Sequence, residues 1–156
     1  MWQPVLMING YLISVLGLAM LIPAAVDMLE TGRNWSLFFT SSIVSLFIGL
    51  SLFLGNRTKI EKITLQQGYL LTAVSWVSLT LLATLPFILS DVTPGFADAL
   101  FEAMSGLSTT GATVITDLEV LPDSILLWRS MLNGLGGVGI VIFAVALLPF
   151  LGIGGM

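Results

Sequence analysis

The sequence predicts an all-α integral membrane protein, because it is strongly apolar, carries few charges and contains four long segments with almost no charge. Hydrophobic residues make up 56% of the 156 residues and charged residues 9%, with a mean hydropathy of +1.04. A soluble domain has about 25% charged residues, so these few charges cannot cover a surface in water. We therefore expect most of the outer surface to contact membrane lipid.

The apolar segments are long enough to cross a bilayer, whose core of about 30 Å needs roughly 20 helical residues. They comprise residues 5–26, 35–54, 68–90 and 125–150. The first segment is too long for the h-region of a signal peptide and lacks a basic n-region. Pro23 and Pro86 are expected to kink or end their helices. The sequence thus predicts four spans.

The charged residues predict the orientation of these spans. Arg57, Lys59 and Lys62 lie in the short loop between the second and third spans, beside one acid, Glu61. Positively charged loops stay in the cytoplasm, which places the N-terminus and the end of the fourth span there too. The outer loops then hold the other acids, namely Asp27, Glu30, Asp91, Asp98, Glu102, Asp117, Glu119 and Asp123. Each acid alone is interpreted as a solvated loop charge, and together they would form an acidic vestibule that concentrates cations.

Missing residue types exclude several kinds of site. The chain has no Cys, which excludes disulfides, iron–sulfur clusters and thiolate zinc sites. It has no His, the commonest metal ligand and general base. We therefore expect neither an enzyme nor a cofactor. The net charge of −4 argues against nucleic acid as a partner.

A short helix is predicted between the third and fourth spans. Thr93-Pro94-Gly95 provides a start signal, and Phe96 to Leu107 follows with acids in its early turns. Four apolar residues fall on one face at helical spacing: Phe96, Leu100, Met104 and Leu107. Twelve residues make a helix of roughly 18 Å, about half the thickness of a membrane.

Small hydroxyl residues and a glycine follow this helix, in the run Ser108 to Thr113. A span, a half-length helix, a small-residue strand and a second span are the layout of a re-entrant pore loop. The helix would direct its partially negative C-terminus at the pathway, and strand carbonyls would replace an ion's hydration shell. Gly111 is expected to take a positive φ or otherwise strained backbone. The candidate filter residues are Thr109, Thr110, Gly111, Ala112 and Thr113. The alternative is a polar turn after an amphipathic helix outside the membrane.

The fourth span contains a glycine cluster, at Gly134, Gly136, Gly137 and Gly139. Three of these glycines have the spacing of a dinucleotide-binding motif, but that motif requires a preceding strand and a later acid, which are absent. Close helix packing is the preferred interpretation. A kinked helix that leaves room for a gate is the alternative.

Arg129 and the tryptophans are assigned structural roles. Arg129 is expected to reach the outer interface or to pair with Asp123 or Glu119. Trp2, Trp35 and Trp128 lie near span ends and are predicted to anchor the interface, whereas Trp76 is predicted to pack inside.

Three stretches resemble the Trk/Ktr/HKT potassium transporter superfamily, and especially its TrkH-like branch. They are FEAMSGLSTTGAT at residues 101–113, LNGLGGVGI at 132–140 and LPFLGIGGM at 148–156. The resemblance covers nearly the whole chain. It implies four span–pore-loop–span units around one pore, preceded by two extra spans. Residues 1–62 would be the two extra spans with the basic loop, and residues 63–156 the first unit.

The resemblance also implies a function and partners. Gly111 would be the filter glycine of the first unit, and the protein would take up potassium, with some sodium, across the inner membrane of a bacterium. Such proteins work as homodimers with a cytosolic nucleotide-binding, TrkA-like regulatory subunit.

The length of the chain departs from this pattern. One filter strand cannot encircle an ion, so we expect the chain to be an N-terminal portion of a longer transporter. Four copies around one pore are a less favoured arrangement, because the extra spans would crowd it. The alternative function is a small, non-conducting membrane scaffold or accessory subunit.

Overall fold

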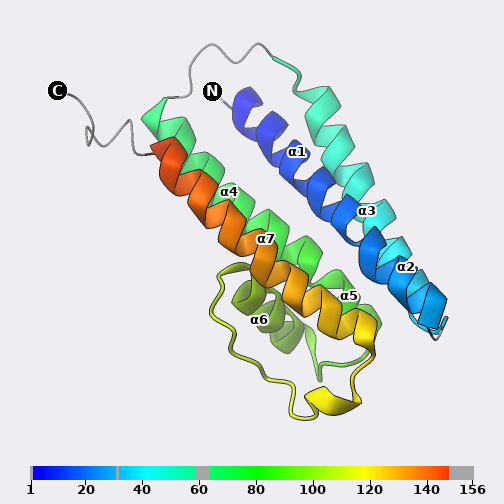
Figure 1. Ribbon diagram of the computed structural model, residues 1–156. Coiled ribbons are helices and arrows are strands. Elements are labelled where there is room, and N and C mark those ends of the chain that lie inside the picture. The colour runs from blue at the N-terminus through cyan, green and yellow to red at the C-terminus, as the bar shows by residue number, and fades with distance from the viewer. Residues whose placement is uncertain (1, 31, 59–63, 148–156) are drawn as a thin grey trace.

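The computed structural model describes residues 2–30, 32–58 and 64–147. Their regular secondary structure is entirely helical (Figure 1). The elements are α1 (Gln3–Ala19), α2 (Leu21–Glu30), α3 (Trp35–Gly55), α4 (Leu65–Ala83), α5 (Leu85–Leu89), α6 (Phe96–Leu107), the 3₁₀ turn η1 (Leu118–Val120) and α7 (Asp123–Leu147).

Four helical stretches are long and apolar enough to cross a membrane, as predicted. They are Gln3–Glu30 (α1 with α2), Trp35–Gly55 (α3), Leu65–Leu89 (α4 with α5) and Asp123–Ile142 in α7. The predicted fourth span continues to residue 150, and its last three residues lie outside the described part of the chain. The same holds for the third stretch that carries the resemblance, at 148–156.

Both predicted proline breaks are present. The first long helix is interrupted at Met20, three residues before Pro23, and the third at Thr84, two residues before Pro86. Proline lacks the N–H that would bond to the carbonyl four residues earlier, so the helix bends there. At the second break, Thr84 is buried, and its amide and its Oγ1 both donate to the Thr80 carbonyl, at 3.0 and 2.7 Å.

The pair α1–α3 is held together by small residues. The two helices run antiparallel, side by side (Figure 1). A Cβ added at Gly10 would lie 2.6 Å from the Phe53 nitrogen, and one added at Gly49 would lie 2.7 Å from the Ser14 nitrogen. Ser42 Oγ donates to the Gly17 carbonyl at 2.7 Å across the pair. Such close backbone contact is the usual way in which helices associate in lipid.

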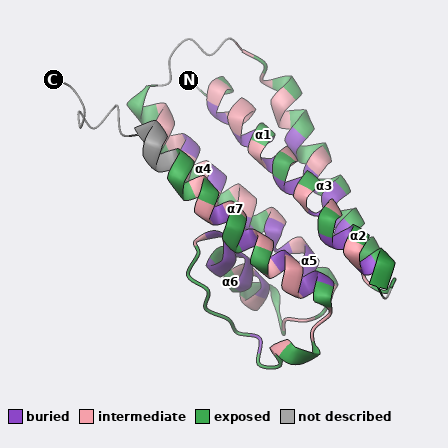
Figure 2. Ribbon diagram, in the orientation of Figure 1, coloured by how far each residue is buried: buried purple, intermediate pink, exposed green. Residues whose placement is uncertain are grey.

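The largest buried cluster joins α1–α3 to the later helices, and Figure 2 shows the buried residues on the helix faces that point at one another. Trp128 is fully buried in it, stacks edge-on against Phe38 with ring centroids 6.3 Å apart, and donates from Nε1 to the Ala83 carbonyl at 3.2 Å. The prediction that Trp128 is an interface anchor is therefore wrong, because the first turns of α7 pack against α2 and α4, where Trp128 meets Phe38 of α3. Trp2 and Trp35 remain exposed.

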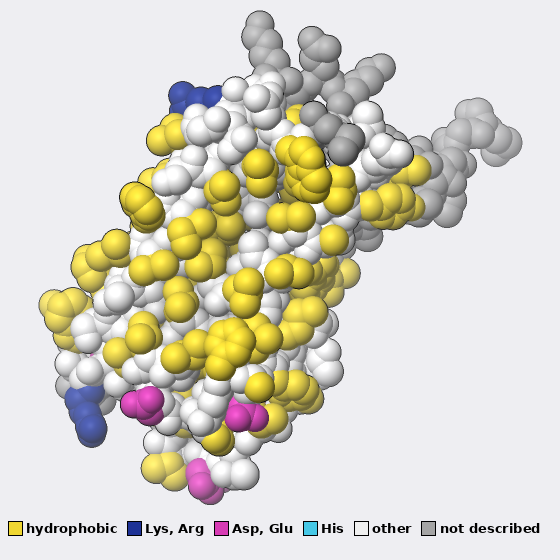
Figure 3. Space-filling model, turned by 180° about the vertical axis from the view of Figure 1, so that it is seen from behind, with side chains coloured by type: hydrophobic (Ala, Val, Ile, Leu, Met, Phe, Trp, Pro, Cys, Tyr) yellow, Lys and Arg dark blue, Asp and Glu magenta, His cyan; other side chains and the backbone are white. Residues whose placement is uncertain are grey.

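The connections gather at two ends of the molecule. The α2–α3 turn, residues 91–95 and residues 108–122 lie at one end, here named the loop end, and the N-terminus and the end of α3 lie at the other (Figure 1). On the face shown in Figure 3, hydrophobic side chains are spread over the middle of the molecule, and the acidic side chains lie near the loop end. Arg57 follows α3 at the opposite end, whereas Lys59, Glu61 and Lys62 lie outside the described residues.

Two of the predicted loop charges are buried instead. Asp27 is 2% exposed and Glu102 is 3% exposed. Asp27 accepts hydrogen bonds from the Asn34 amide at 2.7 Å and from Ser124 Oγ at 3.0 Å. The interpretation of these two acids as solvated charges is wrong, because each lies where a helix from another part of the chain packs over it.

Replacing Gly49 by Ala is expected to lower the free energy of unfolding by about 1–3 kcal/mol. The new methyl group would lie 2.5 Å from Ser14 Oγ and 2.8 Å from the Gly10 carbonyl oxygen, so α1 and α3 must separate. The measurement is thermal unfolding of the purified protein in detergent. Gly55→Ala is the control, because it lies on the same helix with nothing within 4 Å of its added Cβ. Equal melting temperatures for the two variants would contradict this account of the contact.

Candidate functional site

Helix α6 has the predicted bounds, but it buries a different face from the predicted one. Phe96 is 57% exposed and Met104 is 43% exposed, whereas Leu107 of the same predicted apolar stripe is buried. The buried face consists mainly of small residues together with one carboxylate: Ala99, Glu102, Ala103, Ser105 and Gly106. A Cβ added at Gly106 would lie 2.8 Å from Leu132 Cβ. Small side chains let α6 approach α7 closely, so the apolar stripe is left outside.

The C-terminal end of α6 meets α7 at Gly136. A Cβ added there would lie 1.8 Å from the Leu107 carbonyl oxygen, which makes this the closest contact found at any described glycine. Gly136 is the fourteenth residue of α7, about 20 Å along the axis from the first residue. Figure 1 shows the chain running inward from the loop end through α6 and returning to the same end through residues 108–117.

The other glycines of α7 have fewer neighbours within the described chain. The position of a Cβ at Gly137 is 3.8 Å from Thr109 Cγ2, and at Gly134 and Gly139 nothing lies within 4 Å. Gly136 is therefore the member of this cluster that makes a close helix contact in this structure.

The backbone after α6 turns sharply at two residues. Gly111 has φ +75°, the positive value expected of it, and Thr109 has φ +57°. A positive φ at a β-branched residue is strained, and composition alone did not indicate it for Thr109. The Thr110 amide donates to the Ser105 carbonyl at 3.0 Å, and Ser105 Oγ donates to the Ala112 carbonyl at 2.6 Å. Residues 109–114 are all exposed in the chain as described.

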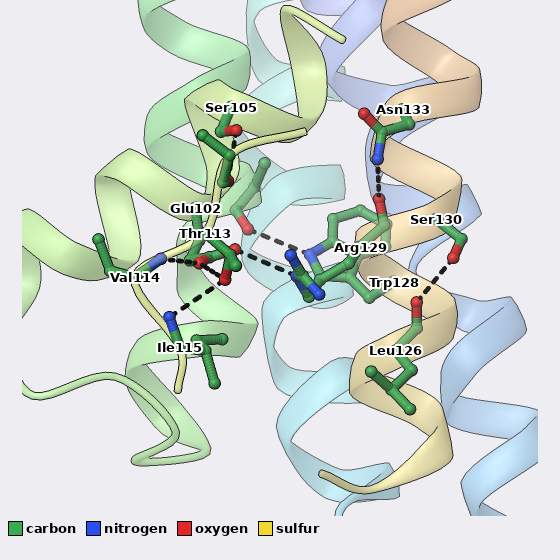
Figure 4. Close-up of polar contacts among 12 residues, drawn as sticks. Glu102, Ser105, Thr113, Val114, Ile115, Leu126, Trp128, Arg129, Ser130 and Asn133 are labelled. Atoms are coloured by element: carbon green, nitrogen blue, oxygen red, sulfur yellow. Dashed lines mark hydrogen bonds and ion pairs between the residues drawn. The ribbon is translucent and has the colours of Figure 1, made fainter. Parts of the chain in front are cut away.

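Glu102 holds the non-helical segment of residues 109–114, here called the strand (Figure 4). Its Oε1 accepts hydrogen bonds from Thr113 Oγ1 and from the Val114 amide, the latter at 2.7 Å. Thr113 Oγ1 in turn accepts from the Ile115 amide at 3.1 Å. One buried carboxylate oxygen thus fixes both a side chain and the backbone of the strand.

The second oxygen of Glu102 binds Arg129 of α7. Arg129 Nε lies 3.1 Å from Glu102 Oε2, with side chains 20% and 1% exposed respectively. The predicted partners, Asp123 and Glu119, and the predicted reach to the interface are therefore wrong. Arg129 is in the second turn of α7, and the small face of α6 brings Glu102 opposite it. The sequence does contain a signal for this burial: Glu102 shares one helix face with two small residues, Ala99 three residues earlier and Gly106 four residues later. Such a face can pack closely against another helix.

A polar cavity of about 150 Å³ lies behind the strand. Its lining includes Ser105, Gly111, Ala112, Arg129, Ser130 and Asn133. A larger cavity of about 670 Å³ opens at the loop end and includes both Arg33 and Asp117 in its lining. Among the described residues, no group of three or more His, Cys, Asp or Glu could hold a metal ion.

Comparison with known proteins places the chain in a family. Residues 35–156 match the family model TrkH, described as a cation transport protein. The chain belongs to the TrkH family. It is 39% identical over 153 residues to the Trk system potassium uptake protein TrkH of Halomonas elongata, covering 97% of this chain and 32% of that protein. For the TrkH of Escherichia coli K12 the identity is 39% over 151 residues, covering 96% of this chain and 31% of that protein.

A solved structure supports the same assignment. The crystal structure of the potassium transporter TrkH from Vibrio parahaemolyticus matches all of this chain and 34% of that chain, with a TM-score of 0.92 and 38% identity. The chain therefore spans about a third of the length of these relatives. It is a helical, multi-pass membrane chain of a transport family, and its relatives are named as uptake proteins rather than as enzymes.

Replacing Gly136 by Ala is expected to lower the free energy of unfolding by about 1–3 kcal/mol, because the methyl group would overlap the Leu107 carbonyl. Thermal unfolding in detergent measures the effect. Gly134→Ala is the matched control, two residues away in the same helix with open space around its added Cβ. A Gly136→Ala protein as stable as Gly134→Ala would show that the end of α6 does not press against α7.

Proposed function

We propose that this chain supplies the first quarter of a potassium-selective pathway, with Thr109 to Thr113 as its filter segment. The whole protein would take up potassium, and some sodium, across the inner membrane of a bacterium. The relatives named as potassium uptake proteins support potassium as the substrate. The observation that carries the site is the inward and outward course of α6 and residues 108–117 beside α7.

The depth of α6 supports a re-entrant pore loop. Its end contacts α7 about 20 Å from the start of that helix, within the range of a hydrocarbon core about 30 Å thick. Non-helical backbone at that depth is tolerated where it is buried in protein or lines a water-filled path. The C-terminus of α6, with its partial negative charge, ends beside the proposed filter and would favour a cation.

The strand geometry supports carbonyl coordination. Positive φ values at Thr109 and Gly111 turn successive peptide groups in a way that regular extended backbone does not. Open space around the Cβ position of Gly111 leaves one side of the strand free for an ion and for other strands. Backbone carbonyls arranged around an axis are the established way to replace the hydration shell of potassium.

The size of the relatives supports a pathway of four units. This chain covers about a third of their length, and two candidate spans, α1 with α2 and then α3, come before the proposed unit. The remaining two thirds would accommodate three more units of the size of residues 63–156. We further propose that the complete protein forms a homodimer and is regulated by a cytosolic, nucleotide-binding TrkA-like subunit.

Gly111→Asp in the full-length protein is expected to abolish potassium uptake or its selectivity, because it adds a Cβ and a charge where carbonyls must align. Potassium and sodium uptake would be measured in potassium-starved cells that lack other uptake systems. Gly32→Asp is the matched control, since Gly32 also has a positive φ, +65°, and open space around it. Normal, selective uptake by the Gly111 variant would refute the filter assignment.

A further inference from the structure

We propose that Glu102, oriented by Arg129, is a positioning residue that sets the ion preference of this segment. The inference rests on the proposed function, because it concerns the same strand. It goes further by naming which side chains outside the strand hold its carbonyls in place. The observation behind it is a buried carboxylate whose two oxygens bind two different parts of the chain.

The second half of the strand, from Ala112 to Val114, depends on side chains of α6 and above all on this carboxylate. Residues 109–114 are exposed, and a polar cavity of about 150 Å³, rather than packed side chains, lies behind Gly111 and Ala112. The amides of Thr109, Thr110 and Gly111 donate to backbone carbonyls at the end of α6. From there to the buried Ile115, the strand is held by Ser105 Oγ at the Ala112 carbonyl and by Glu102 at Thr113 and Val114. The Ala112 and Thr113 carbonyls therefore take their positions from two side chains of α6.

Arg129 orients the carboxylate through a direct contact. The Glu102 side chain is 1% exposed, and a buried carboxylate is tolerated when it is paired and hydrogen-bonded. Arg129 Nε lies 3.1 Å from Oε2, so it fixes the position of that oxygen while Oε1 bonds to the strand. Because Arg129 belongs to α7 and Glu102 to α6, the strand is connected to both of these helices (Figure 4).

The preference for potassium over sodium is the property most sensitive to the position of the strand. Discrimination between potassium and sodium depends on the cavity size or on the number and field of the coordinating carbonyls, and both change when the strand shifts. A relaxed strand would therefore lose selectivity while the surrounding helices stay folded. A purely structural role for the ion pair would instead change protein stability with no change in ion preference.

Glu102→Asp tests the distance, because it keeps the charge but withdraws the carboxylate by one methylene group. We expect the preference for potassium over sodium to fall about tenfold in cellular uptake by the full-length protein. Hydrogen exchange of the segment containing Val114, measured by mass spectrometry on the purified protein, should accelerate. Glu119→Asp is the matched control, because it makes the same change at an exposed residue of η1. Arg129→Gln should reproduce both changes of Glu102→Asp, because it leaves the carboxylate without its counter-charge.

A second pair of variants covers the case in which changes at Glu102 prevent insertion or folding. Thr113→Val removes the hydroxyl that donates to Glu102 and leaves the Glu102–Arg129 pair intact, so it should lower selectivity. Thr113→Ser keeps the hydroxyl and should restore the preference for potassium. Equal selectivity in Thr113→Val and the wild type would overturn the inference.

The two readouts separate this inference from the proposed function. Faster exchange with unchanged selectivity in Glu102→Asp would show that the contact exists but does not set ion preference, which overturns the inference. Wild-type exchange and wild-type selectivity would overturn it as well. Selective uptake by Gly111→Asp, together with faster exchange in Glu102→Asp, would instead refute the filter assignment while leaving the contact itself established.

Discussion

The carboxylate of Glu102 joins three parts of the structure, namely α6, α7 and the strand between them. It lies on α6, accepts two hydrogen bonds from the strand at Thr113 and Val114, and pairs with Arg129 on α7. The strand lacks the regular hydrogen bonds of a helix or a sheet, and irregular backbone is costly where water is excluded. A carboxylate that accepts hydrogen bonds from the strand supplies part of what regular secondary structure would otherwise provide.

The rest of the molecule holds that carboxylate at a defined depth. Gly136 lets the end of α6 touch the α7 backbone, and Gly106 lets the same face approach Leu132. On its other side, α7 is held by two contacts. Its Ser124 donates a hydrogen bond to Asp27 of α2, and its Trp128 packs into the buried cluster. Two buried carboxylates from separate helices thus fix the first turns of α7, so the helices before the proposed pore unit also contribute to its geometry.

Close contact through small residues recurs throughout the fold. It appears between α1 and α3 at Gly10 and Gly49, and again between α6 and α7 at Gly106 and Gly136. In lipid, apolar side chains gain little by leaving their surroundings, so helices associate where backbones come near and polar groups bond. This explains why the apolar stripe at Phe96 and Met104 of α6 stays exposed in the described chain.

The sequence by itself determined the helical class, the four spans, the proline breaks, the bounds of α6 and the positive φ of Gly111. Each follows from local properties, namely apolar length, missing N–H groups and the absence of a Cβ. The tertiary structure alone decided which face of α6 is buried, the Glu102–Arg129 pair, the burial of Trp128 and the strained φ of Thr109. These features depend on which segments meet across long separations in sequence. The local sequence predicts that a charged or aromatic side chain near a span end lies at the membrane interface, and only the tertiary structure shows that another helix covers it.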